Sequence, residues 1–370
     1  MTLRISAIFC LPALFIGPLL RAESVFHDSH APQVSFAAAE IRRALGSQNA
    51  ASDRDLRDVT SDNSSLRFAI AAGADESEAL AQKLQVARLK TTAPQSYAIR
   101  RTEARGRVII AVLGADPVGA MYGGLDVAEA IRLGAMGKTV DSDHSPQIAQ
   151  RGIKFNIPLD RRTPTYSDSS DSAQANIPEM WRMDFWHELL DEMARQRFNV
   201  LSLWNLHPFP SIAKVPEYPD IALKDVWGNR EPFDLNFNMN SKVMSQPFKL
   251  GQVAVVNYMN IDDKIRFWRE VMQYAKNRGI DVYWFTWNTF VWGTEGRHGL
   301  TEDGNNPETV AYFRASASET VRTIRCGREI MKSAQGPFDH EEWLWKTYGK
   351  GIRDGVGPRY SNTLKTRGVR

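Results

Sequence analysis

Aromatic, amide and imidazole side chains follow two apolar runs of the sequence, at the points where buried strands would end. The first run, FNVLSLWNLHPF (198–209), ends in Trp204, Asn205 and His207, and a proline then stops the strand. The second run, IDVYWFTWNTFVW (280–292), carries residues of similar kinds: Trp287, Asn288 and Trp292. Aromatic rings pack against the C–H faces of sugars, while amide and imidazole groups hydrogen-bond to hydroxyls. The two strand ends therefore predict a carbohydrate pocket.

A plainer interpretation exists for the same residues. The tryptophans could belong to the core, and the asparagines could only initiate turns. Because two strands repeat the Trp-Asn pair, we favour the pocket and expect Trp204 and Trp287 to occupy equivalent strand ends. We also expect Trp204, Trp284 and Phe285 to share the inward face of the sheet.

Strands and helices alternate from residue 151 onward. Strands are expected in 151–160, 198–209 and 280–292, and helices in 177–197, 261–279 and 306–324, the first with Phe185, Leu189 and Met193 on its apolar face. This alternation favours a parallel sheet covered by helices. Each strand-to-helix loop runs roughly 20 to 50 residues, whereas the return connections are short, which is typical of the active-site face of a TIM barrel. That face would carry Asp160, Asn205, His207, Asn288 and Trp292.

A smaller α/β unit precedes the barrel-like part. Residues 33–46 predict a helix, 66–73, 95–101 and 107–114 predict strands, and 117–134 predict a helix that begins at a proline and ends at a glycine. We place this domain at 23–140 and a polar linker at 141–150. The glycines between 114 and 124 lack the G-x-G-x-x-G spacing of a dinucleotide loop, so Gly119 and Gly123 are better explained by close packing.

The ends of the chain have compositions of their own. Residues 1–22 combine Arg4, a short apolar stretch and Ala22, which predicts a cleaved export signal and a secreted or periplasmic protein; an uncleaved membrane anchor is the alternative. Cleavage would leave only Cys326 and hence no intramolecular disulfide. The formal net charge of +3 gives no reason to expect nucleic acid as a partner, and no membrane contact is expected after cleavage. No cofactor is expected, and the scattered histidines predict no metal site.

Four segments resemble a broad group of exported glycoside hydrolases. LGADPVGAMYGGLDVAEAI (113–131) resembles the end of the small N-terminal α/β domain of α-glucuronidases and β-hexosaminidases. RGIKFNIPLDRRTPTYSD (151–168), FNVLSLWNLHPFP (198–210) and YWFTWNTFVWG (283–293) resemble their first three barrel strands. The resemblance implies an α/β fold in which a hexosaminidase domain 2-like unit precedes a (β/α)8-type barrel, and the α-glucuronidase branch fits slightly better.

The resemblance also implies a pair of catalytic carboxylates. Glu329, in CGREIM, is the nearest match to the expected glutamate, although an exposed loop residue is the plainer interpretation; Asp160 is the candidate for a supporting acid. We expect a partial barrel of three strand-helix units in 151–325, followed in 326–370 by a divergent helix and a basic disordered tail, and therefore a truncated chain. The expected function is hydrolysis of plant or algal polysaccharide fragments, impaired by truncation. The alternative is a non-catalytic carbohydrate-binding or structural remnant. The oligomeric state is left open.

Overall fold

The chain forms two compact units, Met1–Pro146 and Gln147–Arg370. The computed structural model describes residues 23–46, 54–104, 106–163, 176–229, 253–285, 291, 293–294 and 296–324. The candidate residues Trp287, Asn288, Trp292 and Glu329 lie outside these ranges, as do the expected export signal and the segment 326–370.

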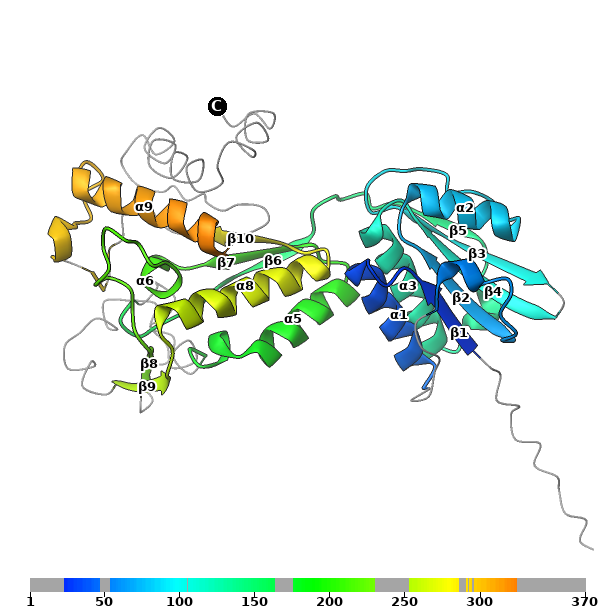
Figure 1. Ribbon diagram of the computed structural model, residues 1–370, viewed down its shortest axis with the longest axis horizontal. Coiled ribbons are helices and arrows are strands. Elements are labelled where there is room, and N and C mark those ends of the chain that lie inside the picture. The colour runs from blue at the N-terminus through cyan, green and yellow to red at the C-terminus, as the bar shows by residue number, and fades with distance from the viewer. Residues whose placement is uncertain are drawn as a thin grey trace, which may run out of the picture. The chain divides into compact units, whose positions relative to one another are not determined.

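The first unit is built on a five-stranded mixed sheet in the order β1-β2-β4-β3-β5 (Figure 1). Its strands are β1 (Glu23–His27), β2 (Leu66–Ala71), β3 (Tyr97–Ala104), β4 (Arg107–Gly114) and β5 (Ser142–His144). β1, β2 and β4 are parallel, whereas β3 runs antiparallel to β4 and β5. The sequence predicted β2, β3 and β4. Part of the expected linker is an edge strand, because Ser142–His144 pairs with Tyr97–Ile99.

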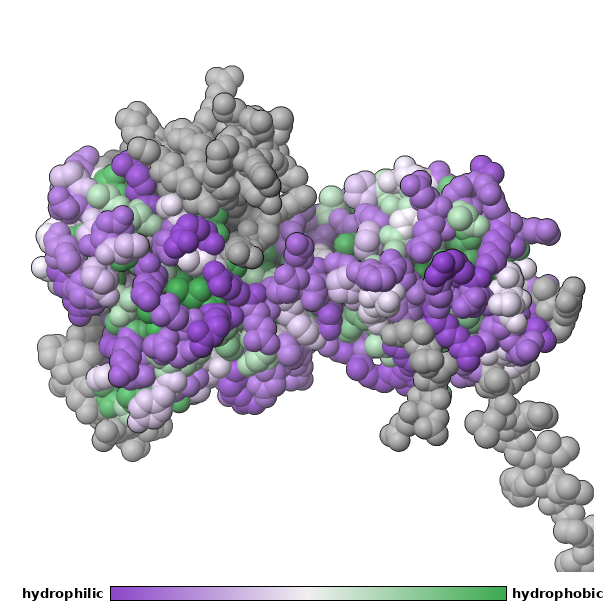
Figure 2. All heavy atoms as spheres, in the orientation of Figure 1, coloured by the Kyte–Doolittle hydropathy of each residue, from purple (hydrophilic) through white to green (hydrophobic). Residues whose placement is uncertain are grey.

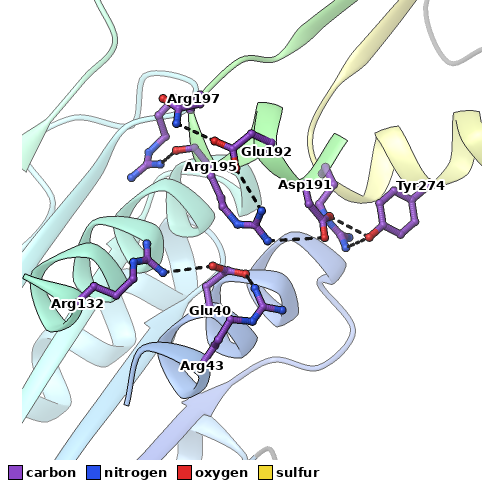
Figure 3. A network of polar contacts seen from close by, with 10 residues as sticks. Glu40, Arg43, Arg132, Asp191, Glu192, Arg195, Arg197 and Tyr274 are labelled. Atoms are coloured by element: carbon purple, nitrogen blue, oxygen red, sulfur yellow. Dashed lines mark hydrogen bonds and ion pairs between the residues drawn. The ribbon is translucent and has the colours of Figure 1, made fainter. Parts of the chain in front are cut away.

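Helices cover both faces of this sheet (Figure 1). The helical segments are α1 (Pro32–Ala44), η1 (Leu56–Asp58), α2 (Ala74–Leu84), α3 (Pro117–Arg132) and η2 (Met136–Lys138). Leu80 and Leu84 of α2 pack against Ala69, Ala71 and Ala111 of the sheet. α1 and α3 lie together against the opposite face. The buried Glu40 joins these two helices by accepting from Arg43 within α1 and from Arg132 of α3 (Figure 3).

Two glycines of α3 are required for the close packing that the sequence predicted. A Cβ at Gly119 would lie 2.2 Å from the Ser96 carbonyl oxygen, and one at Gly123 would lie 2.5 Å from Cγ1 of Val112. Both positions are therefore confirmed as close contacts between the helix and the sheet. The Asp116 side chain caps this helix by accepting from the Gly119 N–H at 2.7 Å.

The second unit contains a three-stranded parallel sheet in the order β10-β7-β6. Its strands are β6 (Gly152–Asn156), β7 (Val200–Trp204) and β10 (Asp281–Phe285), and the helices α5 (Met183–Arg195), α8 (Ile261–Asn277) and α9 (Pro307–Ile324) follow them in turn. Consecutive strands are neighbours, as the alternating sequence pattern predicted. The described residues contain these three parallel strands and no closed barrel.

One face of the three-stranded sheet packs against all three helices. Leu201, Leu203, Val282 and Trp284 share a core cluster with residues of α5, α8 and α9. Trp284 is buried and meets Trp268 of α8 edge-on, with ring centroids 4.6 Å apart. The expectation that Trp284 shares the inward face with Trp204 was therefore wrong. Trp284 pairs with Leu203 and faces the helices because side chains alternate along a strand.

The apolar stripe of α5 is also displaced from the predicted one. Trp186, Leu190 and Met193 are its large buried side chains, while Phe185 and Leu189 are only partly buried. Asp191 of α5 accepts hydrogen bonds from Tyr274 of α8 at 2.9 Å and from Arg278, directly after α8, at 2.6 Å (Figure 3). A capping box between Asn260 and Asp263 begins α8.

Further elements occur in the loops that follow β6, β7 and β10. They are η3 (Glu179–Trp181), α6 (Phe209–Ile212), β8 (Val226–Asn229), β9 (Val253–Asn257) and η5 (Arg297–Gly299). β8 and β9 form an antiparallel pair that the sequence did not predict. α6 begins directly after Pro208, where the second predicted strand was expected to end.

Hydrophilic residues cover most of the visible face of each unit in Figure 2, with smaller apolar areas between them. Within the described ranges, no helix is long and apolar enough to cross a membrane.

Candidate functional site

The parallel sheet presents a second, more polar face away from the helices. The register aligns Lys154 with Ser202 and Tyr283, and Asn156 with Trp204. These five residues are half-buried or exposed, in contrast to the buried leucines that alternate with them on β7. In a parallel sheet the carboxyl ends of the strands lie at one edge, and ligands commonly bind there. Trp204 is the last residue of β7 and lies at this edge.

Trp204 forms a cation–π contact with Lys154. The Lys154 Nζ lies 3.7 Å from the centroid of the indole ring. The two residues come from neighbouring strands and are one diagonal step apart on the same sheet face. A cation and an aromatic ring therefore lie together at the edge of the sheet. The sequence pattern indicates Trp204 as a site residue but not Lys154, because only the strand register brings Lys154 to the Trp204 ring.

Asn205 connects the ends of two strands instead of facing solvent. Its side chain is buried, with the Nδ2 amide donating to the Ile157 carbonyl at 2.8 Å. Its Oδ1 accepts from the His207 N–H at 2.9 Å, which turns the chain out of β7. Asn205 therefore forms a turn, as the plainer interpretation of the sequence predicted. Asn205 holds the position of its neighbour Trp204.

His207 is fully buried beneath the same edge. Its Nε2 lies within hydrogen-bonding distance, 2.9 Å, of the Tyr312 hydroxyl on α9. The rings of Phe209, Tyr312 and Phe313 surround the imidazole at centroid distances of 5.7 to 6.1 Å. The imidazole is therefore enclosed by protein, and it packs between the turn after β7 and helix α9.

Asp160 is buried in a network of charged groups just after β6. Its carboxylate accepts from Arg162 Nε and Nη2, both at 2.8 Å, and from the Trp227 N–H at 3.1 Å. Arg162 also donates to the carbonyl oxygens of Lys224 and Asp225 and stacks on the Trp227 ring. Both carboxylate oxygens are engaged, and they attach the strand end to β8.

Two buried cations near Asp160 were not selected from the sequence. Lys264 of α8 donates to the carbonyl oxygens of Leu223 and Asp225 at 3.0 and 2.6 Å, and burial lowers its pKa to about 8. Burial also lowers the pKa of Arg161 to about 10. The helical spacing of Lys264 with Trp268 and Val271 was the available signal, because it places the lysine on the buried face of α8.

Phe285 is the residue of β10 that pairs with Trp204. Trp287 lies outside the described residues, so the expected equivalence of the two tryptophans stays a prediction. Among the described residues, no cluster of histidine, cysteine or acidic side chains has the arrangement of a metal site.

Comparisons with known proteins relate this fold to glycoside hydrolases. No protein-family model matches the sequence, and no curated protein is similar to it. Among solved structures, a GH138 enzyme targeting the pectin rhamnogalacturonan II has 17% sequence identity and a TM-score of 0.61, over 94% of this chain and 42% of that one. This chain therefore has the fold of the corresponding part of that enzyme and spans less than half of its length.

Two hexosaminidase structures are more distant. The GH20 exo-β-N-acetylglucosaminidase of Vibrio harveyi has 10% identity and a TM-score of 0.47, over 94% of this chain and 47% of that one. The N-acetyl-β-hexosaminidase of Streptomyces plicatus has 13% identity and a TM-score of 0.44, over 83% and 53%. The fold assignment rests on the GH138 enzyme.

Proposed function

We propose that this chain is a carbohydrate-active protein of the glycoside hydrolase type. The observation that carries the proposal is the fold likeness to the GH138 enzyme over 94% of the chain. The order of β6, β7 and β10, each followed by a helix on one common core, supports their assignment as the first three units of a TIM-type barrel. The sugar would then bind at the carboxyl ends of these strands.

Trp204 and Lys154 are the proposed centre of sugar binding. The indole ring suits the C–H face of a sugar, and the ammonium group suits the carboxylate of an acidic one. This combination supports an α-glucuronidase-like preference and substrates from plant or algal polysaccharides. Asn205 and His207 act in this proposal by positioning the edge. Trp287, Asn288 and Trp292 remain proposed contacts from the third strand.

Glu329 is the proposed catalytic acid, with Asp160 in support. Glycoside hydrolysis uses two carboxyl groups, one to protonate the leaving oxygen and one to activate water or attack the sugar. The hydrogen bonds of Asp160 to Arg162 and Trp227 favour a positioning role in which it attaches the loop after β6 to β8. We also propose that residues 1–22 direct export, which makes the protein secreted or periplasmic.

A non-catalytic carbohydrate-binding protein is the second candidate. The observation that favours it is the carboxylate of Asp160, which is fully buried and whose two oxygens both accept hydrogen bonds from Arg162 and Trp227. This candidate keeps the role of Trp204 and removes that of Glu329.

The two candidates are separated by assaying release and binding on one sample of the full chain. Aryl glycosides and glucuronic-acid-bearing xylan fragments are the substrates, and calorimetry on the same sample measures binding. The hydrolase proposal predicts release that Glu329→Gln abolishes and that Glu270→Gln, at an exposed acid of α8, leaves unchanged. Release that survives Glu329→Gln would exclude that residue as the acid. Binding without release would favour the second candidate. If the chain shows no binding and no release, both candidates are contradicted.

A further inference from the structure

The first unit contains a cavity that the proposed function does not use. Its volume is about 640 Å³, within the range of roughly 300 to 1,000 Å³ that small-molecule pockets occupy. It lies at the carboxyl end of β1, between the loop that follows His27, the segment Arg54–Arg57 and one side of α2. β1 runs parallel to β2, so this is the end of the sheet at which ligands commonly bind in open α/β folds.

The charged groups that line the cavity are balanced. Three are cationic, namely Arg54, Arg57 and Lys83, and three are anionic, namely Asp28, Asp55 and Glu76. An anionic ligand would meet three carboxylates, and a cationic ligand would meet three basic groups. A neutral ligand that both donates and accepts hydrogen bonds suits this mixture best.

Contacts within the protein hold several of these groups in place. Arg57 Nε donates to both oxygens of Asp55 at 3.0 Å, and the Asp55 Oδ1 also accepts from the Arg57 N–H at 2.8 Å. Lys83 donates to the Arg57 carbonyl, and Glu76 accepts from the Ala72 N–H. A guanidinium and a carboxylate held side by side can bind the two hydroxyls of a vicinal diol, one as donor and the other as acceptor.

The lining also contains apolar residues. Leu56 and Leu80 are buried and belong to the core of the first unit, and Ala79 on α2 lines the cavity with them. We propose that this cavity binds a neutral sugar, with its hydroxyls on the Asp55–Arg57 pair and Lys83 and its C–H face on Leu56 and Ala79. This cavity belongs to the first unit, whereas the proposed sugar-binding edge belongs to the second. Sugar binding in the cavity does not require hydrolysis.

Hydrogen–deuterium exchange of the full chain tests this proposal and distinguishes the two sites. The probes are methyl galactoside, methyl rhamnoside and methyl xyloside, with galacturonate as the anionic comparison. We expect a dissociation constant on the order of 1 mM for at least one neutral sugar. At a saturating concentration, this sugar should slow exchange in peptides that cover 26–31, 54–58 and 76–84. Peptides that cover 198–209 report separately on the edge of the second unit.

Two variants assign the protection to the cavity. Asp55→Asn keeps an oxygen for the Arg57 N–H but removes the charge, and Lys83→Met removes a donor; each should raise the dissociation constant about tenfold. Asp75→Asn, at an exposed acid of α2 outside the lining, should leave it unchanged. Circular dichroism checks that each variant is folded. Each of three results would overturn the proposal. In the first, no neutral sugar slows exchange at the cavity; in the second, galacturonate slows it more strongly; in the third, all variants bind equally.

Discussion

The imidazole Nε2 of His207 lies 2.9 Å from the hydroxyl of Tyr312, and both side chains are fully buried. The contact connects the turn after β7 to α9, more than one hundred residues later in the chain. The contact holds the loop that follows Trp204 against α9. The proposed sugar-binding edge is therefore positioned by buried polar contacts beneath it.

Tyr312→Phe tests the strength of this connection. The substitution keeps the ring and removes the hydroxyl, which leaves the imidazole nitrogen without that partner, so we expect the free energy of unfolding to fall by about 1 to 3 kcal/mol. Urea denaturation followed by tryptophan fluorescence measures the change. Tyr258→Phe, at a tyrosine that is 82% exposed, is the control and should have no measurable effect. Equal stability of the two variants would show that the buried contact contributes nothing.

Gly152→Ala should separate two neighbouring strands. A Cβ at Gly152 would lie 2.1 Å from the Val200 carbonyl oxygen and 2.6 Å from the Val200 Cβ, so β6 and β7 would have to move apart. We expect a loss of about 1 to 3 kcal/mol, as overpacking typically causes. Gly137→Ala is the matched control, because no atom lies within 4 Å of its added Cβ. Thermal unfolding of the two variants measures the difference, and a wild-type melting temperature for Gly152→Ala would contradict the strand contact.

Lys264 should make folding stability depend on pH in the alkaline range. Its pKa is lowered by burial from 10.5 to about 8, so between these values the unfolded chain binds more protons than the folded one. Stability should therefore rise with pH across this interval, by at most about 1.4 kcal/mol per pH unit from this group. Lys264→Met should remove this part of the slope. Denaturant titrations of both proteins at pH 7.5 and 9.5 measure it, and parallel pH dependences would contradict the assignment.

Asp160→Asn should weaken the attachment of the loop after β6 to β8, because it removes the buried carboxylate of an ion pair with Arg162. Arg162, whose side chain is 25% exposed, would remain partly buried without its carboxylate, so we expect the free energy of unfolding to fall by about 3 kcal/mol, the lower end of the range for buried pairs. Glu217→Gln, at an exposed acid, is the control. If Asp160→Asn instead lost only glycoside release and kept wild-type stability, a direct catalytic role would replace the positioning role.

Much of the fold could be predicted from the sequence, because apolar periodicity is a local property. The strands at 66–71 and 200–204 and the helices around Trp268 and Tyr312 were predicted from their own residues. β1 and the β8–β9 pair were missed. β1 begins with the polar residues Glu23 and Ser24, and β8 is stabilised by β9, which follows more than twenty residues later.

The candidate site was less predictable, because residue type does not determine side-chain direction. Asn205 and His207 have the chemistry of sugar ligands, yet their polar atoms bond to Ile157 and Tyr312. Lys154 shows the opposite case, since only the register of β6 and β7 brings it over the Trp204 ring.

Binding of a glucuronic-acid-bearing xylan fragment, measured by calorimetry, tests the proposed sugar-binding edge most directly. Trp204→Ala and Lys154→Met should each weaken binding by about tenfold or more, because each removes a stacking or charged contact of about 1.5 kcal/mol. Tyr258→Ala controls for the loss of an exposed aromatic ring and should bind like the wild type. Wild-type affinity in folded Trp204→Ala and Lys154→Met would contradict the account.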